Sequence, residues 1–429
     1  MRFYSTKGQA RPVSFQEAVF KGLPEDNGLY MPEKIPALPS SFFEDIKSKS
    51  LAEIGFEVMQ LFVEDEIPGE TLKNIINETL NFDIPLKQVQ GDVFSLELFH
   101  GPTFAFKDVG ARFLARCLSY FSRKSKQKLT VLVATSGDTG SAVAQGFYGV
   151  PNIEVVILYP SGKISRFQEQ QMTTLGQNIT ALEVDGVFDD CQRMVKQAFL
   201  DEELNEHSNL TSANSINIAR MLPQSIYYFY GWAQIPKEKR KNLVFSVPSG
   251  NYGNLTAGLI AQKMGLPVHH FLACSNANDT VPNYLETGDY IPKPSISTIS
   301  NAMDVGDPSN FTRMLDLYSN SHSNMKEHIS GFTFSDEETR NTIRQVYENT
   351  GYVMDPHGAI GWLGLQKYLE SHTTNGIFLE TAHPYKFKVT VEGEIERSLK
   401  PVLEFDQKKK QSISFENNFD ALKKYLISR

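Results

Sequence analysis

The chain has 429 residues, of which 41% are hydrophobic and 21% are charged, and its formal net charge is −8 at pH 7. This length exceeds what one small core needs and predicts two or three packed units. The acidic balance argues against a general binder of nucleic acid or anionic membranes, which requires a basic surface. A small anionic ligand stays open, because one helix N-terminus and a few cations suffice to bind a phosphate.

Cysteine spacing and hydropathy narrow the class of protein further. Cys117, Cys191 and Cys274 have neither a disulfide framework nor a metal-ligand spacing, so we expect buried thiols in a reducing compartment. No apolar run approaches the roughly 18 residues of a membrane helix. The N-terminus lacks the apolar core of a secretory signal. The sequence therefore predicts a cytoplasmic protein with no metal, membrane or nucleic-acid partner.

The pattern along the chain changes near residue 95. Residues 1–95 contain two helical patterns, around 51–62 and 71–80, and are expected to form a packed N-terminal unit. Beyond them, short apolar strands alternate with helices. The expected strands are residues 129–135, 153–159, 179–184, 242–247, 268–273 and 376–381. Such strands predict an α/β architecture with parallel sheets covered on both faces and ligands at the carboxyl ends of the strands.

A glycine loop, Ser-Gly-Asn-Tyr-Gly-Asn at residues 249–254, stands between an expected strand and an expected helix. Glycines there let the backbone approach a ligand, and the N–H groups of the helix start attract an anion. The alternative is a tight structural turn, which is the commoner use of such a loop. The spacing fits neither the dinucleotide fingerprint nor the P-loop.

A second loop of this kind, Thr-Ser-Gly-Asp-Thr-Gly at residues 135–140, is rich in hydroxyls. Its helix start is suited to a carboxylate or a phosphate. Alternatively, Ser136, Asp138 or Thr139 caps the N–H groups of the helix itself. The residues alone leave both interpretations open.

Lys107 stands in Phe-Ala-Phe-Lys-Asp, next to the aromatic residues Phe104 and Phe106. Partial desolvation would lower its pKa and favour a Schiff base. Most lysines beside aromatic residues are ordinary surface side chains, so this feature carries little weight by itself.

Asn217 and Arg220 are three residues apart and can share one side of a helix start. Together with Ser215 they offer amides, a hydroxyl and a guanidinium, which suits a phosphate. A capped helix with a surface arginine is the simpler alternative.

Taken together, these segments resemble the threonine synthase family. In chain order, the segments that carry the resemblance are residues 98–108, 134–140, 158–165, 212–220, 247–254, 300–304 and 381–384. Seven motifs in one order make coincidence implausible. The similarity extends from the first residues to about residue 387 and is nearer to the long branch of the family, which has an extra N-terminal unit.

The resemblance implies a pyridoxal 5′-phosphate enzyme of the tryptophan synthase β-like fold (fold type II), with the cofactor between two α/β domains. Three ranges are then expected. Residues 1–95 form the N-terminal unit, 96–215 the smaller α/β domain with the cofactor lysine, and 216–429 the larger α/β domain with the cofactor-phosphate loop. The family is a lyase that converts O-phospho-L-homoserine and water into L-threonine and phosphate, the last step of threonine biosynthesis.

The resemblance also implies roles for individual residues. Lys107 would be catalytic, forming the Schiff base and moving protons on the substrate. The residues implied in cofactor binding are Gly250, Asn251, Tyr252, Gly253 and Asn254 around the phosphate, Thr381 facing the pyridine nitrogen, and Asp138. Those implied in substrate binding are Ser136, Thr139, Ser215, Asn217, Arg220 and Lys163.

Three other functions are considered as alternatives to threonine synthase. A serine/threonine dehydratase uses the same lysine chemistry but needs no site for a substrate phosphate, which Arg220 argues against. A catalytically silent relative is opposed by the retained Lys107. A nucleotide-binding module fails because neither glycine loop has the required spacing. We expect a monomer, because the extra N-terminal unit would cover surface that shorter relatives bury in a dimer.

Overall fold

A computed structural model describes residues 1–63, 66–123, 128–402 and 409–428. The chain divides into two compact units. Unit 1 consists of residues 31–106 and 221–402 together with Met1, and unit 2 consists of residues 2–30, 107–220 and the C-terminal segment. These units do not follow the three consecutive ranges predicted from the sequence. The reason is that each central sheet takes strands from distant parts of the chain.

Unit 1 is built on a six-stranded sheet with the order β11-β10-β9-β12-β4-β3, in which only β3 is antiparallel to its neighbour. The strands are β3 (Leu86–Gln90), β4 (Val93–Glu97), β9 (Val244–Pro248), β10 (His270–Ser275), β11 (Ile329–Thr333) and β12 (Gly376–Glu380). Strands β4, β9, β10 and β12 are buried along their whole length. The apolar runs in the sequence predict this for β9, β10 and β12, whereas β4 was not among the expected strands.

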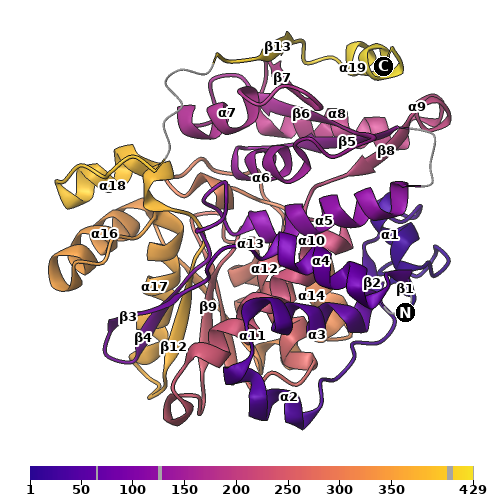
Figure 1. The fold of residues 1–429 in the computed structure, drawn as a ribbon. Coiled ribbons are helices and arrows are strands. Elements are labelled where there is room, and N and C mark those ends of the chain that lie inside the picture. The colour runs from indigo at the N-terminus through magenta and orange to yellow at the C-terminus, as the bar shows by residue number, and fades with distance from the viewer. Residues whose placement is uncertain (64–65, 124–127, 403–408, 429) are drawn as a thin grey trace. The chain divides into compact units, whose positions relative to one another are not determined.

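Helices cover both faces of this sheet (Figure 1). The helices of unit 1 are α2 (Ser40–Asp45), η1 (Ile46–Ser48), α3 (Leu51–Val63), α4 (Gly69–Thr79), η3 (Leu222–Gln224), α11 (Ser225–Gln234), η4 (Lys237–Lys239), α12 (Gly253–Lys263), α13 (Thr280–Thr287), η5 (Asn301–Met303), α14 (Phe311–Leu317), α15 (His322–Lys326), α16 (Asp336–Thr350), α17 (Pro356–Leu369), η6 (Pro384–Phe387) and α18 (Lys388–Ile395). On one face Ser246 of β9 donates a hydrogen bond to the carbonyl of Gly361 in α17. On the other face the neighbouring Phe245 packs against Gly231 of α11.

Unit 2 is built on a five-stranded parallel sheet with the order β13-β7-β6-β5-β8. The strands are β5 (Leu129–Ala134), β6 (Ile153–Pro160), β7 (Ile179–Val184), β8 (Asn209–Ser212) and β13 (Ser412–Phe415). Strand β13 comes from the C-terminal part of the chain, and Figure 1 shows it beside β7 with α19 following it. Leu132, Val156 and Leu182 of this sheet share a buried cluster with Met194 of α8 and Leu422 of α19.

The remaining elements belong to unit 2 or to the points where the chain passes from one unit to the other. Those of unit 2 are β1 (Phe3–Ser5), α1 (Phe15–Lys21), α5 (Lys107–Ser122), α6 (Asp138–Phe147), α7 (Arg166–Thr173), α8 (Phe188–Leu200), α9 (Glu202–His207) and α19 (Phe419–Ile427). The passages contain β2 (Tyr30–Pro32) and α10 (Ile218–Met221).

The structure confirms the predicted α/β architecture and all six predicted strands, each within a few residues. It also confirms three buried free thiols, Cys117, Cys191 and Cys274. In the described ranges, no helix has the length and apolar character to cross a membrane.

Candidate active site

Three neighbouring parallel strands of unit 1 lead to segments that the sequence singled out, and these segments lie at one edge of the sheet. Strand β4 runs toward Lys107, β12 is followed directly by Thr381, and β9 is followed by the glycine loop at residues 249–254. Since the carboxyl ends of parallel strands meet at the same edge, the sheet brings these segments together.

The segment before Lys107 is fastened to the end of β12. The backbone N–H of Leu98 donates to the carbonyl of Glu380, and that of Phe106 donates to the carbonyl of Thr381, each at 2.9 Å. Phe106 directly precedes Lys107, the first residue of α5. The backbone directly before Lys107 is therefore held at Thr381, the residue that was predicted to face the cofactor ring.

Further contacts hold the same segment, and sequence reasoning missed their donors. The hydroxyl of Tyr227 donates to the carbonyl of Phe106. The buried ammonium of Lys386 donates to the carbonyl of Thr103 at 3.0 Å. Burial lowers the pKa of His383 to about 4, so this histidine is neutral near pH 7. Of Tyr227, Lys386 and His383, only His383 lies in a motif that the sequence singled out.

The glycine loop ends in a left-handed residue at the start of an eleven-residue helix. Tyr252 has φ 59°, and as the N-cap of α12 it provides no side-chain hydrogen bond. A left-handed conformation is uncommon for tyrosine and costs about 1 kcal/mol or more, so the surrounding structure must hold it. The result is a helix start whose N–H groups are suited to an anion.

The side chains of this loop are engaged within the protein. The Asn251 Oδ1 atom accepts the N–H of Ser309 at 2.6 Å, and the Tyr252 hydroxyl lies 2.5 Å from that of Ser275. The Asn254 amide accepts from the hydroxyl of Ser249 at 2.5 Å. An anion at this loop would therefore meet mainly backbone N–H groups.

Two buried acidic residues, Glu380 and Asp355, are joined by a hydrogen bond, and Glu380 directly precedes Thr381 in the chain. The Oε1 atom of Glu380 accepts the N–H of Asp355 at 2.6 Å, and the Asp355 carboxylate bonds to the ring of His357. Burial, reinforced by the charge of Asp355, raises the pKa of Glu380 well above its ordinary value. Burial and a neighbouring carboxylate therefore both disfavour a charge on Glu380, the last residue of β12. Sequence reasoning missed this pair, because Glu380 ends an apolar run.

In unit 2, the predicted residues gather at one edge of the five-stranded sheet. Strands β5, β6 and β8 are parallel, so the segments after them share this edge. Those segments contain Ser136, Asp138, Thr139, Lys163, Ser215 and Asn217. A hydrogen bond of 3.0 Å from the amide of Asn214 to the carbonyl of Ala134 joins the ends of β8 and β5.

The cap of α6 is not one of the residues that the sequence offered for it. The hydroxyl of Thr135 accepts the N–H groups of Gly137 at 2.9 Å and of Gly140 at 2.8 Å. The capping alternative is therefore wrong as to the residue. Asp138 is buried and accepts a hydrogen bond of 2.9 Å from the amide of Gln168. The hydroxyls of Ser136 and Thr139 belong to half-buried residues.

Asn217 and Arg220 are both buried. The Asn217 amide donates to the carbonyls of Val19 at 2.9 Å and Ser212 at 3.1 Å, and its oxygen accepts the N–H of Ala219 at 3.0 Å. These three bonds give Asn217 a firm structural role in unit 2.

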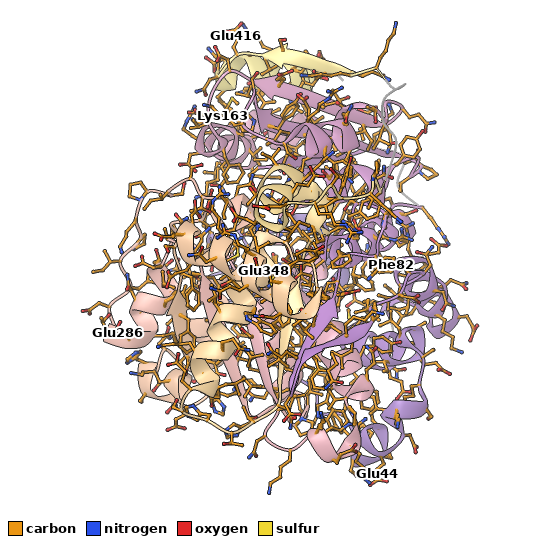
Figure 2. The ribbon with its side chains drawn as sticks, turned by 90° about the vertical axis from the view of Figure 1, so that its left-hand side faces the viewer. Glu44, Phe82, Lys163, Glu286, Glu348 and Glu416 are labelled. Carbon is orange, nitrogen blue, oxygen red and sulfur yellow. The ribbon has the colours of Figure 1, made fainter. Side chains whose placement is uncertain are left out.

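The guanidinium of Arg220 donates to the carbonyl of Ala213, and only 2% of the residue is exposed. A surface arginine, the simpler alternative at the sequence level, is therefore wrong. Lys163, in contrast, lies on the exposed surface of unit 2 (Figure 2).

Comparisons with known proteins show which family this chain is similar to. A family model described as "Pyridoxal-phosphate dependent enzyme" matches residues 79–376, and one described as "Threonine synthase N terminus" matches residues 2–80. The threonine synthase of Haemophilus influenzae is 46% identical, with all of both chains covered. The crystal structure of threonine synthase from Escherichia coli is 43% identical with a TM-score of 0.94, again over all of both chains. The structure of pyridoxal-phosphate-bound threonine synthase from Brucella melitensis is 33% identical with a TM-score of 0.93, covering 100% of this chain and 99% of that one.

The fold and the first family match define the class: this is a pyridoxal-phosphate-dependent enzyme of fold type II. Identity above 40% over the full length of two relatives narrows the class further. The chain belongs to the threonine synthase family.

The residues of unit 1 fit pyridoxal 5′-phosphate. The start of α12, without a side-chain cap from Tyr252, suits its phosphate. Thr381, whose hydroxyl is neutral, directly follows β12. In the described residues, no group of three or more histidine, cysteine, aspartate or glutamate side chains is arranged to hold a metal.

Proposed function

We propose that this protein converts O-phospho-L-homoserine and water into L-threonine and phosphate, with Lys107 as its catalytic residue. The observation that supports this most is the hydrogen bond from the N–H of Phe106 to the carbonyl of Thr381. It fixes the main chain immediately before Lys107 at the sheet edge that carries the glycine loop. A lysine in this position has the chemistry to bind an aldehyde covalently through its Nζ atom.

Five residues of the loop, Gly250, Asn251, Tyr252, Gly253 and Asn254, would hold the cofactor phosphate, chiefly through backbone N–H groups. The hydroxyl of Thr381 would face the ring nitrogen. Because a hydroxyl carries no charge, it leaves that nitrogen less protonated than a carboxylate would. Asp138 would act near the phenolic oxygen of the cofactor.

When bound, pyridoxal phosphate withdraws electrons from the substrate carbons and so makes their protons removable. Lys107 would then take and return protons at Cα, Cβ and Cγ of the substrate. Phosphate departs from Cγ, and a water molecule adds its hydroxyl at Cβ.

The unit 2 residues would bind the substrate. Ser136 and Thr139 offer hydroxyls to its carboxylate. Ser215 and Arg220 are proposed for its phosphate, with Lys163 as a further cation. Asn217, whose two amide hydrogens already bond to carbonyls of Val19 and Ser212, would hold this segment in place. A buried guanidinium supports this assignment most strongly, because its planar fork matches the oxygen atoms of a phosphate.

We further propose that the protein acts as a monomer in the cytoplasm. The net charge of −8 supports a small-molecule substrate over a nucleic acid.

The decisive experiment offers the purified enzyme two kinds of substrate. We expect phosphate release from O-phosphohomoserine together with threonine formation, and little ketoacid from serine or threonine. Lys107→Ala should abolish the turnover and the covalent cofactor, because the Schiff base needs this amine. Borohydride reduction followed by peptide mapping should place the pyridoxyl label on Lys107.

Two results would contradict the proposal separately. A label on another lysine would overturn the assignment of Lys107 while leaving the reaction standing. Ketoacid as the only product would instead indicate a dehydratase, which needs no site for a substrate phosphate.

A further inference from the structure

The glycine loop rests on a second segment of unit 1, residues 298–309. A Cβ atom added to Gly250 would lie 2.6 Å from the Cα atom of Met303, so the two backbones touch directly. The next loop residue, Asn251, accepts the N–H of Ser309 at 2.6 Å. Two successive residues of the loop are therefore set by this segment.

The segment is in turn organised around the carboxylate of Asp304, which ends η5. Its Oδ2 atom accepts the N–H of Thr298 at 3.0 Å, and its Oδ1 atom accepts the hydroxyl of Thr298 at 2.7 Å. The amides of Asn276 and Asn278 donate to Oδ1 at 2.9 and 3.3 Å. Both asparagines follow β10, the neighbour of β9, so the network links the ends of two adjacent strands.

An ionised carboxylate satisfies these donors well. Each group that faces Asp304 in this network presents a hydrogen, and a carboxylate is an acceptor without a hydrogen of its own. Burial raises the pKa of Asp304 to about 6, while the hydrogen bonds from Thr298 and Asn276 and the nearby His357 oppose that rise. The group is therefore ionised at about pH 8. A carboxamide in its place would turn N–H hydrogens toward at least one donor.

We infer that Asp304 is a positioning residue for the cofactor phosphate: it holds residues 298–304 against Gly250 and thereby sets the backbone N–H groups of the glycine loop. Asp304 acts through Met303 and touches neither substrate nor cofactor. The inference rests on the proposed function in one respect, namely that the loop binds the phosphate of pyridoxal phosphate.

The test compares binding of pyridoxal 5′-phosphate with binding of pyridoxal, which lacks the phosphate. Full-length protein is freed of cofactor and titrated with each compound at about pH 8. Asp304→Asn should weaken pyridoxal phosphate binding about tenfold, the equivalent of one lost hydrogen bond, and pyridoxal binding by less than about twofold. At saturating pyridoxal phosphate, kcat should stay within about twofold of the wild type, because the reacting groups are unchanged.

Asp307→Asn is the matched control. Asp307 is three residues away and exposed, and it accepts a hydrogen bond of 2.8 Å from the hydroxyl of Tyr290, which an asparagine can still accept. Its binding constants should equal those of the wild type. Thr298→Val provides a second variant in case Asp304→Asn does not fold. It removes one donor to the carboxylate and should produce a smaller loss, again confined to pyridoxal phosphate.

Equal weakening of both compounds in Asp304→Asn would overturn the inference, since it would show a general structural effect. Binding that matches the Asp307→Asn control would overturn it as well. Failure of the proposed function is seen elsewhere: the wild-type protein would then bind pyridoxal phosphate no better than pyridoxal, or would not bind it at all.

Discussion

Helices α12 of unit 1 and α6 of unit 2 both begin after a buried parallel strand and a glycine-containing loop. They differ in which side chains accept the backbone N–H groups of the first turn. At α6, the hydroxyl of Thr135 accepts two backbone N–H groups, those of Gly137 and Gly140. At α12, the Asn254 side chain accepts the backbone N–H of Leu255 at 2.9 Å, besides the hydroxyl of Ser249. In the part of the chain that the structure describes, no side-chain oxygen accepts the N–H groups of Tyr252, Gly253 or Asn254.

This difference separates two ways of binding an anion. The start of α12 offers backbone N–H groups, which suit a ligand that stays bound, such as the cofactor phosphate. In unit 2, the hydroxyl of Thr135 already accepts two N–H groups at the start of α6. Unit 2 would instead bind an anion through side chains at its sheet edge, above all the guanidinium of Arg220. Side chains adapt more easily to a substrate that arrives and leaves. We therefore propose different roles for these two similar loops.

The largest effect on ligand recognition is expected at Arg220. Arg220→Lys keeps the charge but loses the planar fork, and it should lower kcat/KM for O-phosphohomoserine about 100-fold, since hydrogen bonds to a charged group contribute about 1.5–3 kcal/mol each. Steady-state phosphate release measures this. The cofactor spectrum should not change.

Arg116→Lys is the control for Arg220. Arg116 also lies in unit 2 and donates to a backbone carbonyl, that of Gly146, at 2.9 Å. If Arg220→Lys and Arg116→Lys lower kcat/KM to the same extent, the role of Arg220 is structural only. The proposal that unit 2 binds an anion through side chains then fails.

A smaller effect, on cofactor affinity, is expected at the glycine loop. In Gly250→Ala the added Cβ meets the Met303 backbone at 2.6 Å, which should cost about 1–3 kcal/mol and weaken pyridoxal phosphate binding about tenfold. Gly393→Ala is the control, because its Cβ would meet no atom within 4 Å. Cofactor titration and denaturant unfolding of the apo-protein measure the two consequences. Unchanged affinity in Gly250→Ala would reduce the loop to a structural turn.

The sequence predicted the local elements well, because strands buried on both faces appear as apolar runs. Residues 129–135, 179–184 and 376–381 became β5, β7 and β12 with ends shifted by at most one residue. The makeup of the units was not predictable in the same way. It depends on pairings such as β13 with β7, which join residues more than 200 positions apart.

The candidate site was predictable as a set of segments and less so as individual roles. Asn217 has a polar side chain in a family motif, yet its amide bonds to the carbonyl of Val19, 198 residues earlier. The raised pKa of Glu380 arises from burial and from the charge of Asp355, the N-cap of α17, which packs on the sheet. Such partners are set by tertiary structure, and neither spacing nor periodicity indicates them.

The smallest effect on ligand binding is expected at the capped helix. Thr135 is buried, and Thr135→Val keeps its shape but leaves the N–H groups of Gly137 and Gly140 without their acceptor. Unsatisfied buried donors should lower the free energy of unfolding by about 1–3 kcal/mol. Thr135→Ser, which keeps the hydroxyl, should recover most of this loss. Pyridoxal phosphate affinity should change by less than about twofold in both variants, because the cap serves α6 and not the cofactor phosphate.

The two measurements on Thr135→Val separate stability from binding and so test the comparison at its weakest point. A loss of stability with unchanged affinity is what a helix start served by its own chain requires. If Thr135→Val weakens pyridoxal phosphate as much as Gly250→Ala does, then the hydroxyl orders N–H groups that the cofactor itself uses. Both helix starts would then belong to one cofactor site, and the division between a backbone-binding unit 1 and a side-chain-binding unit 2 would have to be abandoned.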